Sequence, residues 1–364
     1  MQREELRGWL VLNASGLSVD RQLRLLEVFG GPGGVLGARD EDLTAVPGIE
    51  AIHVRKLREA QAGPVVEEAE KKLAELGATV VGITDDAYPA ALREIPLPPP
   101  MLYVEGELRP QEPAVAIVGT RKCTPYGRQM ARRLGYDLAA RGLTIISGMA
   151  LGIDAEAHEG ALEAGGRTVA VLGCGLDITY PPQHKTLRTR IAAQGAVVTE
   201  LPFGAEPTRE QFPRRNRIIS GLGMGVVIVE APLGSGALIT ANYAAEHGRE
   251  VFAVPGDVTR AESAGCNALI RDGATLVTCA EDVLEGLNFA PEMLPARPAA
   301  ARAEGLPPDE AAVYEGLGGE TKTVDDLVAA TGLEAPRIMA ALMMLEVKGL
   351  VRRFGGGAYA RTET

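Results

Sequence analysis

The sequence is poor in aromatic residues and in cysteine. Aromatic side chains make up 4% of the 364 residues, whereas there are 44 glycines and 24 prolines, so we expect an aliphatic core and many turns. The four cysteines stand far apart and form no Cys-x-x-Cys pair, which argues against disulfides and zinc and favours reduced thiols in a cytoplasmic protein. No run of eighteen apolar residues occurs, so no membrane-spanning helix is expected.

Sequence motifs of common nucleotide-binding and catalytic sites are also missing. No Gly-x-x-x-x-Gly-Lys-Ser/Thr segment occurs, which excludes a Walker A loop, and the three spaced glycines of the dinucleotide fingerprint are absent as well. No Ser/His/Asp order, no pair of acid and base carboxylates and no metal-ligand spacing stands out. We therefore expect no catalytic residue, no metal and no cofactor.

The overall charge of the chain counts against nucleic acid at first sight, because the net charge is −11. However, net charge governs solubility and long-range steering, whereas nucleic-acid binding needs only a local cationic surface. The relevant question is therefore where the positive side chains gather.

Residues 1–82 predict a small helical domain of the SAM-like or helix-hairpin-helix-like kind. Val46-Pro47-Gly48-Ile49 precedes an amphipathic stretch, residues 50–60, and resembles half of a helix-hairpin-helix, although Glu50 stands where such hairpins usually carry a second glycine. Residues 1–80 hold ten Lys/Arg and thirteen Asp/Glu. Because phosphate affinity needs local positive charge, this balance favours a module that contacts protein over one that binds DNA.

Residues 83–287 predict a doubly wound, Rossmann-like α/β domain with a mostly parallel sheet. After a proline-rich connector that ends in a short strand at 101–104, apolar runs alternate with helical stretches. The runs are continuous rather than alternating, as in parallel strands that are covered on both faces. The predicted strands are 115–119, 143–147, 168–173, 196–200, 225–230, 251–254 and 275–277, and clear helices lie at 154–164, 185–194 and 239–247.

The C-terminal part predicts a linker and a winged helix. Residues 288–308 are rich in alanine and proline, as linkers are. Residues 309–364 read as three helices followed by a glycine-tipped hairpin, which is the order of a winged helix-turn-helix.

The charge of this winged helix does not favour DNA. Residues 306–364 hold six Lys/Arg and nine Asp/Glu, and the recognition helix is mostly apolar. The cations that could reach phosphates are Arg337, Lys348, Arg352 and Arg353. A protein-contact or regulatory role is at least as well supported as DNA binding.

A binding site is expected beyond the carboxyl ends of the strands, where ligands bind in doubly wound sheets. Small, polar or glycine residues follow each of the predicted strands. A need for turn-forming residues would explain any one of these positions, but a whole sheet edge of them favours a binding site. The turn after the predicted strand 115–119 adds two cations, Arg121 and Lys122, before a helical stretch. This arrangement can offer backbone N–H groups and positive charge to a phosphate. Ser235 caps a later helix, whose N-terminus could hold another phosphate. The predicted binding residues here are Gly119, Thr120, Arg121, Lys122, Ser147, Gly148, Gly234, Ser235 and Gly236.

The densest cationic stretch follows the fourth main strand, at residues 209–217. Its arginines precede the apolar pair Ile218-Ile219, which anchors a helix. Cations in the first turn of a helix oppose the helix dipole, so we interpret them as functional rather than as a solvated helix start. Arginine binds phosphate oxygens, asparagine can read base edges and phenylalanine can stack on a base, a combination suited to single strands. The predicted binding residues here are Arg209, Phe212, Arg214, Arg215, Asn216 and Arg217.

These motifs, taken in order, resemble the DprA/Smf family. The resemblance covers residues 85–285 closely and rests on Gly119-Thr-Arg121, Ser147-Gly-Met-Ala-Leu-Gly-Ile-Asp154, Tyr180-Pro181, Phe212-Pro-Arg-Arg-Asn-Arg-Ile-Ile219, Gly234-Ser-Gly-Ala-Leu-Ile-Thr-Ala241 and Val251-Phe-Ala-Val-Pro-Gly256. The helical and winged-helix parts resemble accessory domains of that family through weaker motifs.

The resemblance implies a non-catalytic protein of natural transformation (competence) that takes part in DNA recombination. Such a protein would bind and protect incoming single-stranded DNA, load RecA onto it, displace single-strand-binding protein and act as a homodimer. By position, Arg121 corresponds to the family's main phosphate-binding arginine. Arg209 corresponds to a basic residue of the family, and Phe212 to an aromatic residue near the DNA. Lys122, Arg214 and Arg215 rest on local charge alone.

A second hypothesis is an enzyme related to the nucleotide phosphoribohydrolases. Those enzymes carry a glycine-rich loop before a helix, with a sequence similar to Pro-Gly-Gly-x-Gly-Thr-x-x-Glu. The glutamate of this motif is catalytic. In this chain the loop reads Gly234-Ser-Gly-Ala-Leu-Ile-Thr240, so threonine stands where that glutamate would be. A hydrolase needs a positioned acid or base, which makes this hypothesis the weaker one.

Overall fold

The computed structural model describes residues 3–289, 306–318, 321–347, 350–353 and 357–361. The chain divides into two compact units, residues 1–294 and 295–364. Most of the predicted linker, at 290–305, and the predicted hairpin tip, at 354–356, lie outside the described residues.

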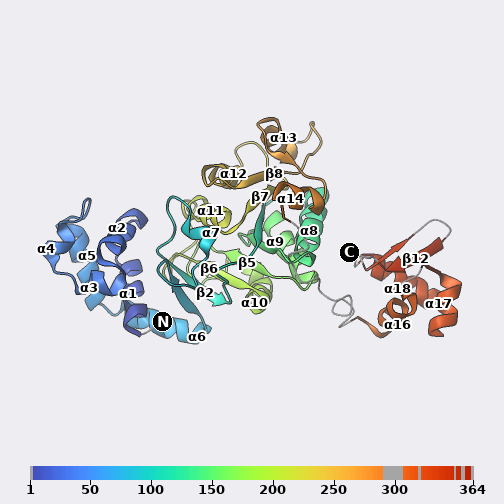
Figure 1. The fold of residues 1–364 in the computed structure, drawn as a ribbon, viewed down its shortest axis with the longest axis horizontal. Coiled ribbons are helices and arrows are strands. Elements are labelled where there is room, and N and C mark those ends of the chain that lie inside the picture. Colours follow the sequence, from blue (N-terminus) through green and yellow to red (C-terminus); the bar gives the residue numbers. More distant parts are fainter. Residues whose placement is uncertain (1–2, 290–305, 319–320, 348–349, 354–356, 362–364) are drawn as a thin grey trace. The chain divides into compact units, whose positions relative to one another are not determined.

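The first unit is built on one nine-stranded sheet with the strand order β1-β2-β6-β5-β4-β3-β7-β8-β9 (Figure 1). Strands β3 to β9 run parallel, while β1 and β2 are antiparallel and extend the sheet beyond β6. The strands are β1 (Thr79–Gly82), β2 (Met101–Gly106), β3 (Ala114–Val118), β4 (Thr144–Ser147), β5 (Thr168–Val171), β6 (Ala196–Thr199), β7 (Gly225–Ile228), β8 (Glu250–Ala253) and β9 (Thr275–Leu276). The predicted doubly wound sheet is confirmed.

Both faces of the sheet are covered by helices, which explains the continuous apolar strands. In β3, Val115 and Ile117 pack beneath one helical layer, and Ala116 and Val118 beneath the other, because successive side chains of a strand point to opposite faces. The first layer contains α8 (Pro125–Ala140), α9 (Ile153–Glu163) and α14 (Ala280–Gly286). The second contains α7 (Ala90–Arg93), α11 (Gln211–Leu222), α12 (Gly236–Glu246) and α13 (Ala264–Arg271), while α10 (Lys185–Gln194) packs on β5 and β6.

The direction of winding reverses between β3 and β7. From β3 the chain proceeds through β4, β5 and β6 to one side, and then returns to place β7, β8 and β9 on the other side. Loops after β3 and β7 therefore diverge and leave a crevice at the carboxyl edge, which is where doubly wound folds bind ligands.

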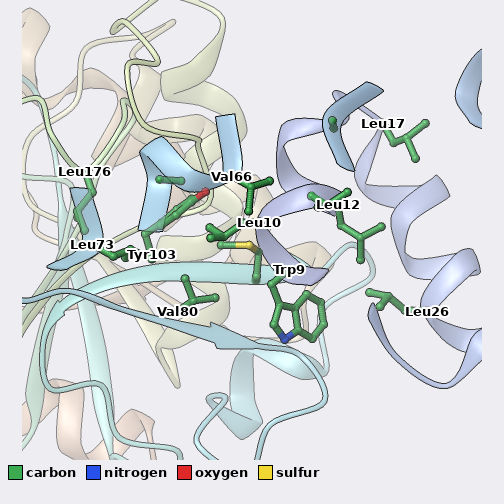
Figure 2. Packing of buried hydrophobic residues seen from close by; sticks show 14 of the residues in the cluster. Trp9, Leu10, Leu12, Leu17, Leu26, Val66, Leu73, Val80, Tyr103 and Leu176 are labelled. Carbon is green, nitrogen blue, oxygen red and sulfur yellow. The ribbon is translucent and has the colours of Figure 1, made fainter. Parts of the chain in front are cut away.

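Six helices precede the sheet and share a hydrophobic core with it. They are α1 (Arg3–Ala14), α2 (Val19–Phe29), α3 (Pro32–Gly37), α4 (Asp40–Thr44), α5 (Ala51–Ala62) and α6 (Val65–Leu76). Figure 2 shows Leu10 of α1 and Val66 and Leu73 of α6 near Tyr103 of β2. The N-terminal helices are thus packed onto the β2 side of the sheet.

The second unit is a winged helix, as predicted. Helices α16 (Pro308–Leu317), α17 (Val324–Thr331) and α18 (Ala335–Val347) pack around Leu317, Leu327 and Leu342 beside a sheet of order β10-β12-β11. Its strands are β10 (Lys322–Thr323), β11 (Val351–Arg353) and β12 (Ala358–Arg361). Of the helices that the structure describes, none alone is long and apolar enough to span a membrane. The pair α17–α18 passes the same test only across a bend of 109°.

Candidate functional site

A cleft of about 820 Å³ opens at the carboxyl edge of the sheet, at the point where the winding reverses. The turns after β3 and β7 and the first turns of α11 form its walls. Ten of the predicted residues line it: Gly119, Thr120, Arg121, Lys122, Arg209, Phe212, Arg215, Asn216, Ser235 and Gly236. Residues that are up to 117 positions apart in the chain are thus brought into one site.

The backbone of the turn after β3 is held by hydrogen bonds, whereas the side chains of its two cations are exposed. The N–H of Thr120 donates to the carbonyl of Glu230 at 2.7 Å, and the N–H of Lys122 donates to Thr120 Oγ1 at 3.2 Å. A Cβ on Gly119 would lie 2.6 Å from a side-chain carbon of Ile153, so only glycine permits this approach. The side chains of Arg121 and Lys122 are exposed at the cleft.

The N-terminus of α8 is already occupied by a carboxylate of the protein itself. Glu230, which is 3% exposed, accepts from Thr124 N at 2.8 Å and from Thr124 Oγ1 at 2.6 Å. An internal carboxylate thus interacts with the positive end of the helix dipole. The backbone N–H of Thr124 at this helix start is therefore not available to a phosphate. The exposed side chains of Arg121 and Lys122 are the cations that this turn presents to the cleft.

A second internal carboxylate holds the loop after β4. Asp154, in the first turn of α9, accepts from Gly148 N at 3.2 Å and from Ala150 N at 3.4 Å. It lines the floor of the cleft but is only 5% exposed, and burial raises the pKa of its carboxyl. Ser147 lies inside the sheet, where its hydroxyl donates to the carbonyl of Ile117 at 2.6 Å. Ser147 therefore supports the cleft without reaching it.

The arginines around the start of α11 divide into an exposed and a buried pair. Arg209 and Arg214 are exposed, whereas Arg215 and Arg217 are 5% and 8% exposed. Arg215 donates to the carbonyls of Gly148, at 2.9 Å, and Val171. Burial lowers the pKa of Arg215 to about 10, so it is charged at neutral pH.

Arg217 lies away from the cleft and pairs with Glu200 at the end of β6, with 2.5 Å between Nη2 and Oε2. Arg214 does not line the cleft either, although its side chain is exposed. The prediction that all the arginines of this stretch are free to bind is therefore corrected for Arg215 and Arg217. Their charges are used to join α11 to the ends of β4, β5 and β6.

The ring of Phe212 has two neighbours at the cleft, the guanidinium of Arg121 and the ring of Tyr180. The guanidinium of Arg121 is 4.8 Å from the centre of its ring, and the ring of Tyr180 is 5.6 Å away at an angle of 36°. A Cβ on Gly173 would lie 2.8 Å from the Phe212 ring, so the glycine at the end of β5 leaves room for it. Tyr180 is 38% exposed and lines the cleft. The Tyr180-Pro181 motif by itself does not indicate that this ring belongs to the cleft.

The start of α12 forms the opposite wall. Ser235 Oγ accepts from Ala237 N at 3.3 Å, so the predicted cap is confirmed. Asn216 Nδ2 donates to the carbonyl of Gly236 at 3.2 Å, and its Oδ1 accepts from Arg215 Nε at 3.3 Å. In this arrangement the amide of Asn216 holds two elements together rather than facing a base. Gly234 has a φ of 76° and stands beside the lining residues.

No group of three or more His, Cys, Asp or Glu side chains is placed to hold a metal ion within the described residues. The pair Asp154 and His158 lies on α9, but His158 is completely buried and its Nδ1 is 2.6 Å from Thr168 Oγ1. Burial lowers the pKa of His158 to about 3, so the ring is neutral at physiological pH.

The winged helix presents methionines where a DNA-reading helix would present cations. Met339, Met343 and Met344 of α18 are 60%, 68% and 46% exposed. Arg337 is paired with Asp309. Lys348 and the side chains of Arg352 and Arg353 lie outside the described part of the chain.

Comparison with known proteins assigns the family. A family model described as DNA recombination-mediator protein A matches residues 79–288, which is more than half of the chain, and a DprA winged helix domain model matches residues 297–357. The chain belongs to the DprA family.

Among its DprA-family relatives, Protein Smf of Synechocystis sp. is 39% identical over 312 residues, covering 76% of this chain and 78% of the relative. DNA processing protein DprA of Streptococcus pneumoniae is 44% identical over 208 residues, covering 57% of this chain and 73% of the relative. Both relatives thus match more than half of this chain.

Solved DprA structures share the fold. The X-ray structure of Streptococcus pneumoniae DprA has a TM-score of 0.68 at 36% identity and covers 76% of this chain and 95% of that one. DprA from Helicobacter pylori, whose structure was solved for its single-stranded DNA binding mode, has a TM-score of 0.53 at 30% identity and covers 58% of this chain and 95% of that one.

Proposed function

We propose that this DprA-family chain binds single-stranded DNA in the cleft at the carboxyl edge of its sheet, in the cytoplasm and without hydrolysing it. The observation that carries the proposal is the exposed guanidinium of Arg121 stacked on Phe212, with Lys122 and Arg209 on the same cleft. Three cations can neutralise successive phosphates, and the rings of Phe212 and Tyr180 can stack on bases that a single strand leaves unpaired. The single-stranded DNA binding of the Helicobacter pylori relative supports the same function.

The two internal carboxylates favour a strand over a free nucleotide as the ligand of the cleft. Glu230 occupies the start of α8, and Asp154 accepts the amides of the loop after β4. A terminal phosphate group gains most from a helix start or a nest of amides, and carboxylates of the protein fill two such places, whereas Ser235 and Gly236 at the start of α12 line the cleft. A chain of singly charged phosphodiesters instead gains from several separate arginine and lysine side chains.

The test is fluorescence anisotropy with a labelled oligothymidine. We expect Arg121→Ala to weaken binding by about tenfold or more, since a hydrogen bond to a charged group contributes about 1.5–3 kcal/mol. The matched control is Arg133→Ala, an exposed arginine of α8 that lies outside the cleft. Equal affinity of wild type and Arg121→Ala would overturn the proposed function.

We further propose that the protein acts in natural transformation as a homodimer that protects incoming strands, displaces single-strand-binding protein and loads RecA. Membership of the DprA family supports this proposal. Loading of RecA first requires that the protein bind single-stranded DNA, which is the role proposed for the cleft. The measurement is the DNA-dependent ATPase of RecA on oligothymidine coated with single-strand-binding protein. Addition of wild type should restore the ATPase, and Arg121→Ala should not.

An enzymatic function is the second candidate, because one acidic side chain, Asp154, lines the cleft with its pKa raised by burial. Its carboxylate is held by two amides, however, and Thr240, where the related hydrolases carry their glutamate, is 1% exposed. Incubation with AMP should release no ribose 5-phosphate. Release that is lost in Asp154→Asn would favour the enzyme.

A further inference from the structure

The N-terminal helices are joined to the sheet by a tight apolar contact. Trp9 of α1 lies flat on Gly82 of β1, where a Cβ would collide with the indole. Beside it, Leu10, Leu73 and Tyr103 belong to one buried cluster that also includes Leu176, after β5 (Figure 2). All these side chains are at most 5% exposed. A contact of this kind transmits position, because closely packed interiors deform little.

Polar contacts from the same helices converge on the segment that follows β6. Asn13 of α1 donates through Nδ2 to the carbonyl of Glu200 at 2.8 Å. The hydroxyl of Tyr103 donates to Oδ1 of the same Asn13 side chain at 3.1 Å. The segment that begins there is therefore fixed at its first residue by a side chain of the N-terminal helices.

A second set of contacts comes from α6. Lys72 Nζ lies 2.6 Å from Asp177 Oδ2 and 5.6 Å from the centre of the Phe203 ring. The other oxygen of Asp177 accepts from Gly204 N at 2.8 Å. Lys72 thus supports the segment at Phe203 and, through Asp177, at Gly204.

This segment leads directly into the cleft. Arg209 follows Gly204 by five residues, and Phe212 lies in the first turn of α11. The side chain of Glu200, whose carbonyl Asn13 holds, pairs with Arg217 two turns into α11. Glu200, whose carbonyl the N-terminal helices contact, is therefore also joined to α11 through its side chain.

We propose that the N-terminal helices position the segment from residue 200 to residue 212 and thereby set the affinity of the cleft for single-stranded DNA, without contacting the DNA themselves. The inference rests on the proposed function. Asn13 and Lys72 are its positioning residues. Direct contact is disfavoured because residues 1–80 carry more acidic than basic side chains and because Lys72 is already paired with Asp177. A strand is bound most tightly when Arg209 and Phe212 are held in place beforehand, since their ordering then costs little at the moment of binding.

The test measures oligothymidine affinity of the full chain as a function of salt for Lys72→Met, Asn13→Ala and the double variant. We expect binding to weaken by about threefold to tenfold in the double variant, because Arg209 and Phe212 must then be ordered at the moment of binding. The dependence of log affinity on log salt should stay at the wild-type slope, because no phosphate contact is lost. Arg209→Ala, in contrast, should lower that slope by roughly 0.7.

Matched controls separate positioning from loss of charge. Lys71→Met removes the neighbouring charge, which pairs with Glu75 on the exposed face of α6, and should bind like wild type. Lys72→Arg keeps the charge near Asp177 and Phe203 and should retain most of the affinity. Thermal unfolding of each variant verifies that the fold is intact.

Two results overturn the inference while leaving the proposed function in place. One is wild-type affinity of the double variant alongside weakened binding by Arg121→Ala. The other is a reduced salt slope in Lys72→Met, which identifies Lys72 as a direct phosphate contact. If wild type itself does not bind the oligonucleotide, the proposed function fails and the inference fails with it.

Discussion

The exposed arginines of the cleft and the buried arginines of α11 show how the same side chain serves two purposes within a few residues. Arg121 and Arg209 project from turns and have open guanidinium groups at the cleft. Arg215 and Arg217 are enclosed, and their donors are directed to strand-end carbonyls and to Glu200. The difference teaches that the position of a guanidinium relative to the sheet edge, rather than the local density of charge, decides which arginines can meet a phosphate.

The strongest test of this comparison is Arg215→Met, which removes the buried charge that acts on the carboxyl of Asp154 and leaves two carbonyls without their donor. We expect the free energy of unfolding to fall by about 3 kcal/mol, as for other buried pairs that lose one member. Urea denaturation followed by circular dichroism measures it. Arg121→Met, the exposed counterpart, should stay within about 0.5 kcal/mol of wild type. Equal losses in the two variants would remove the distinction between the buried and exposed arginines.

His158 is buried like Arg215 and Arg217, and its burial predicts that the stability of the fold depends on pH. Burial lowers its pKa to about 3 in the folded state, against 6.5 for an exposed histidine. The unfolded chain therefore binds the proton first, so stability is complete above pH 6.5 and is lost as the pH falls toward 3. At pH 5 the loss from this residue amounts to about 2 kcal/mol.

The measurement is the difference in unfolding free energy between wild type and His158→Asn at pH 8 and at pH 5. The difference should shrink by about 2 kcal/mol at pH 5, because the variant lacks the group that titrates. A constant difference would show that His158 is not held neutral in the folded protein.

On the exposed side, Phe212→Leu should weaken oligothymidine binding by about tenfold, because stacking of a base on an aromatic ring contributes about 1–3 kcal/mol. The salt slope should not change, since no charge is removed. Tyr126→Leu, an exposed tyrosine on α8 outside the cleft, is the control. If both variants bind alike, the ring of Phe212 supports Arg121 without meeting a base.

The smallest expected effect belongs to Lys122→Ala. Its ammonium is exposed at the cleft and is more strongly hydrated than a guanidinium, so we expect a loss of affinity of about threefold, as for exposed ion pairs. The salt slope should decrease by roughly 0.7 as one phosphate contact disappears. An unchanged slope would show that Lys122 does not contact a phosphate.

Much of the architecture followed from local pattern. Continuous apolar runs between helical stretches indicated parallel strands, and the pairing of β3 with β4 and β7 confirmed them. The carboxyl edge followed from strand direction alone, which is why Arg121, Phe212 and Ser235 could be assigned to one site before their contacts were known. Tyr180 was missed because the loop after β5 folds back toward Phe212, and no local pattern encodes that return.

By itself, the sequence determined the doubly wound sheet, the helical and winged-helix parts and the edge at which the cleft opens, because these depend on periodicity and chain direction. Only the tertiary structure decided which arginines are free, since burial depends on what distant segments place around a side chain. It also showed that Glu230 fills the start of α8 and that Asn13 and Lys72 reach the segment before α11. These are contacts between residues 105 to 187 positions apart, for example Asn13 with Glu200, so no short-range pattern could have carried them.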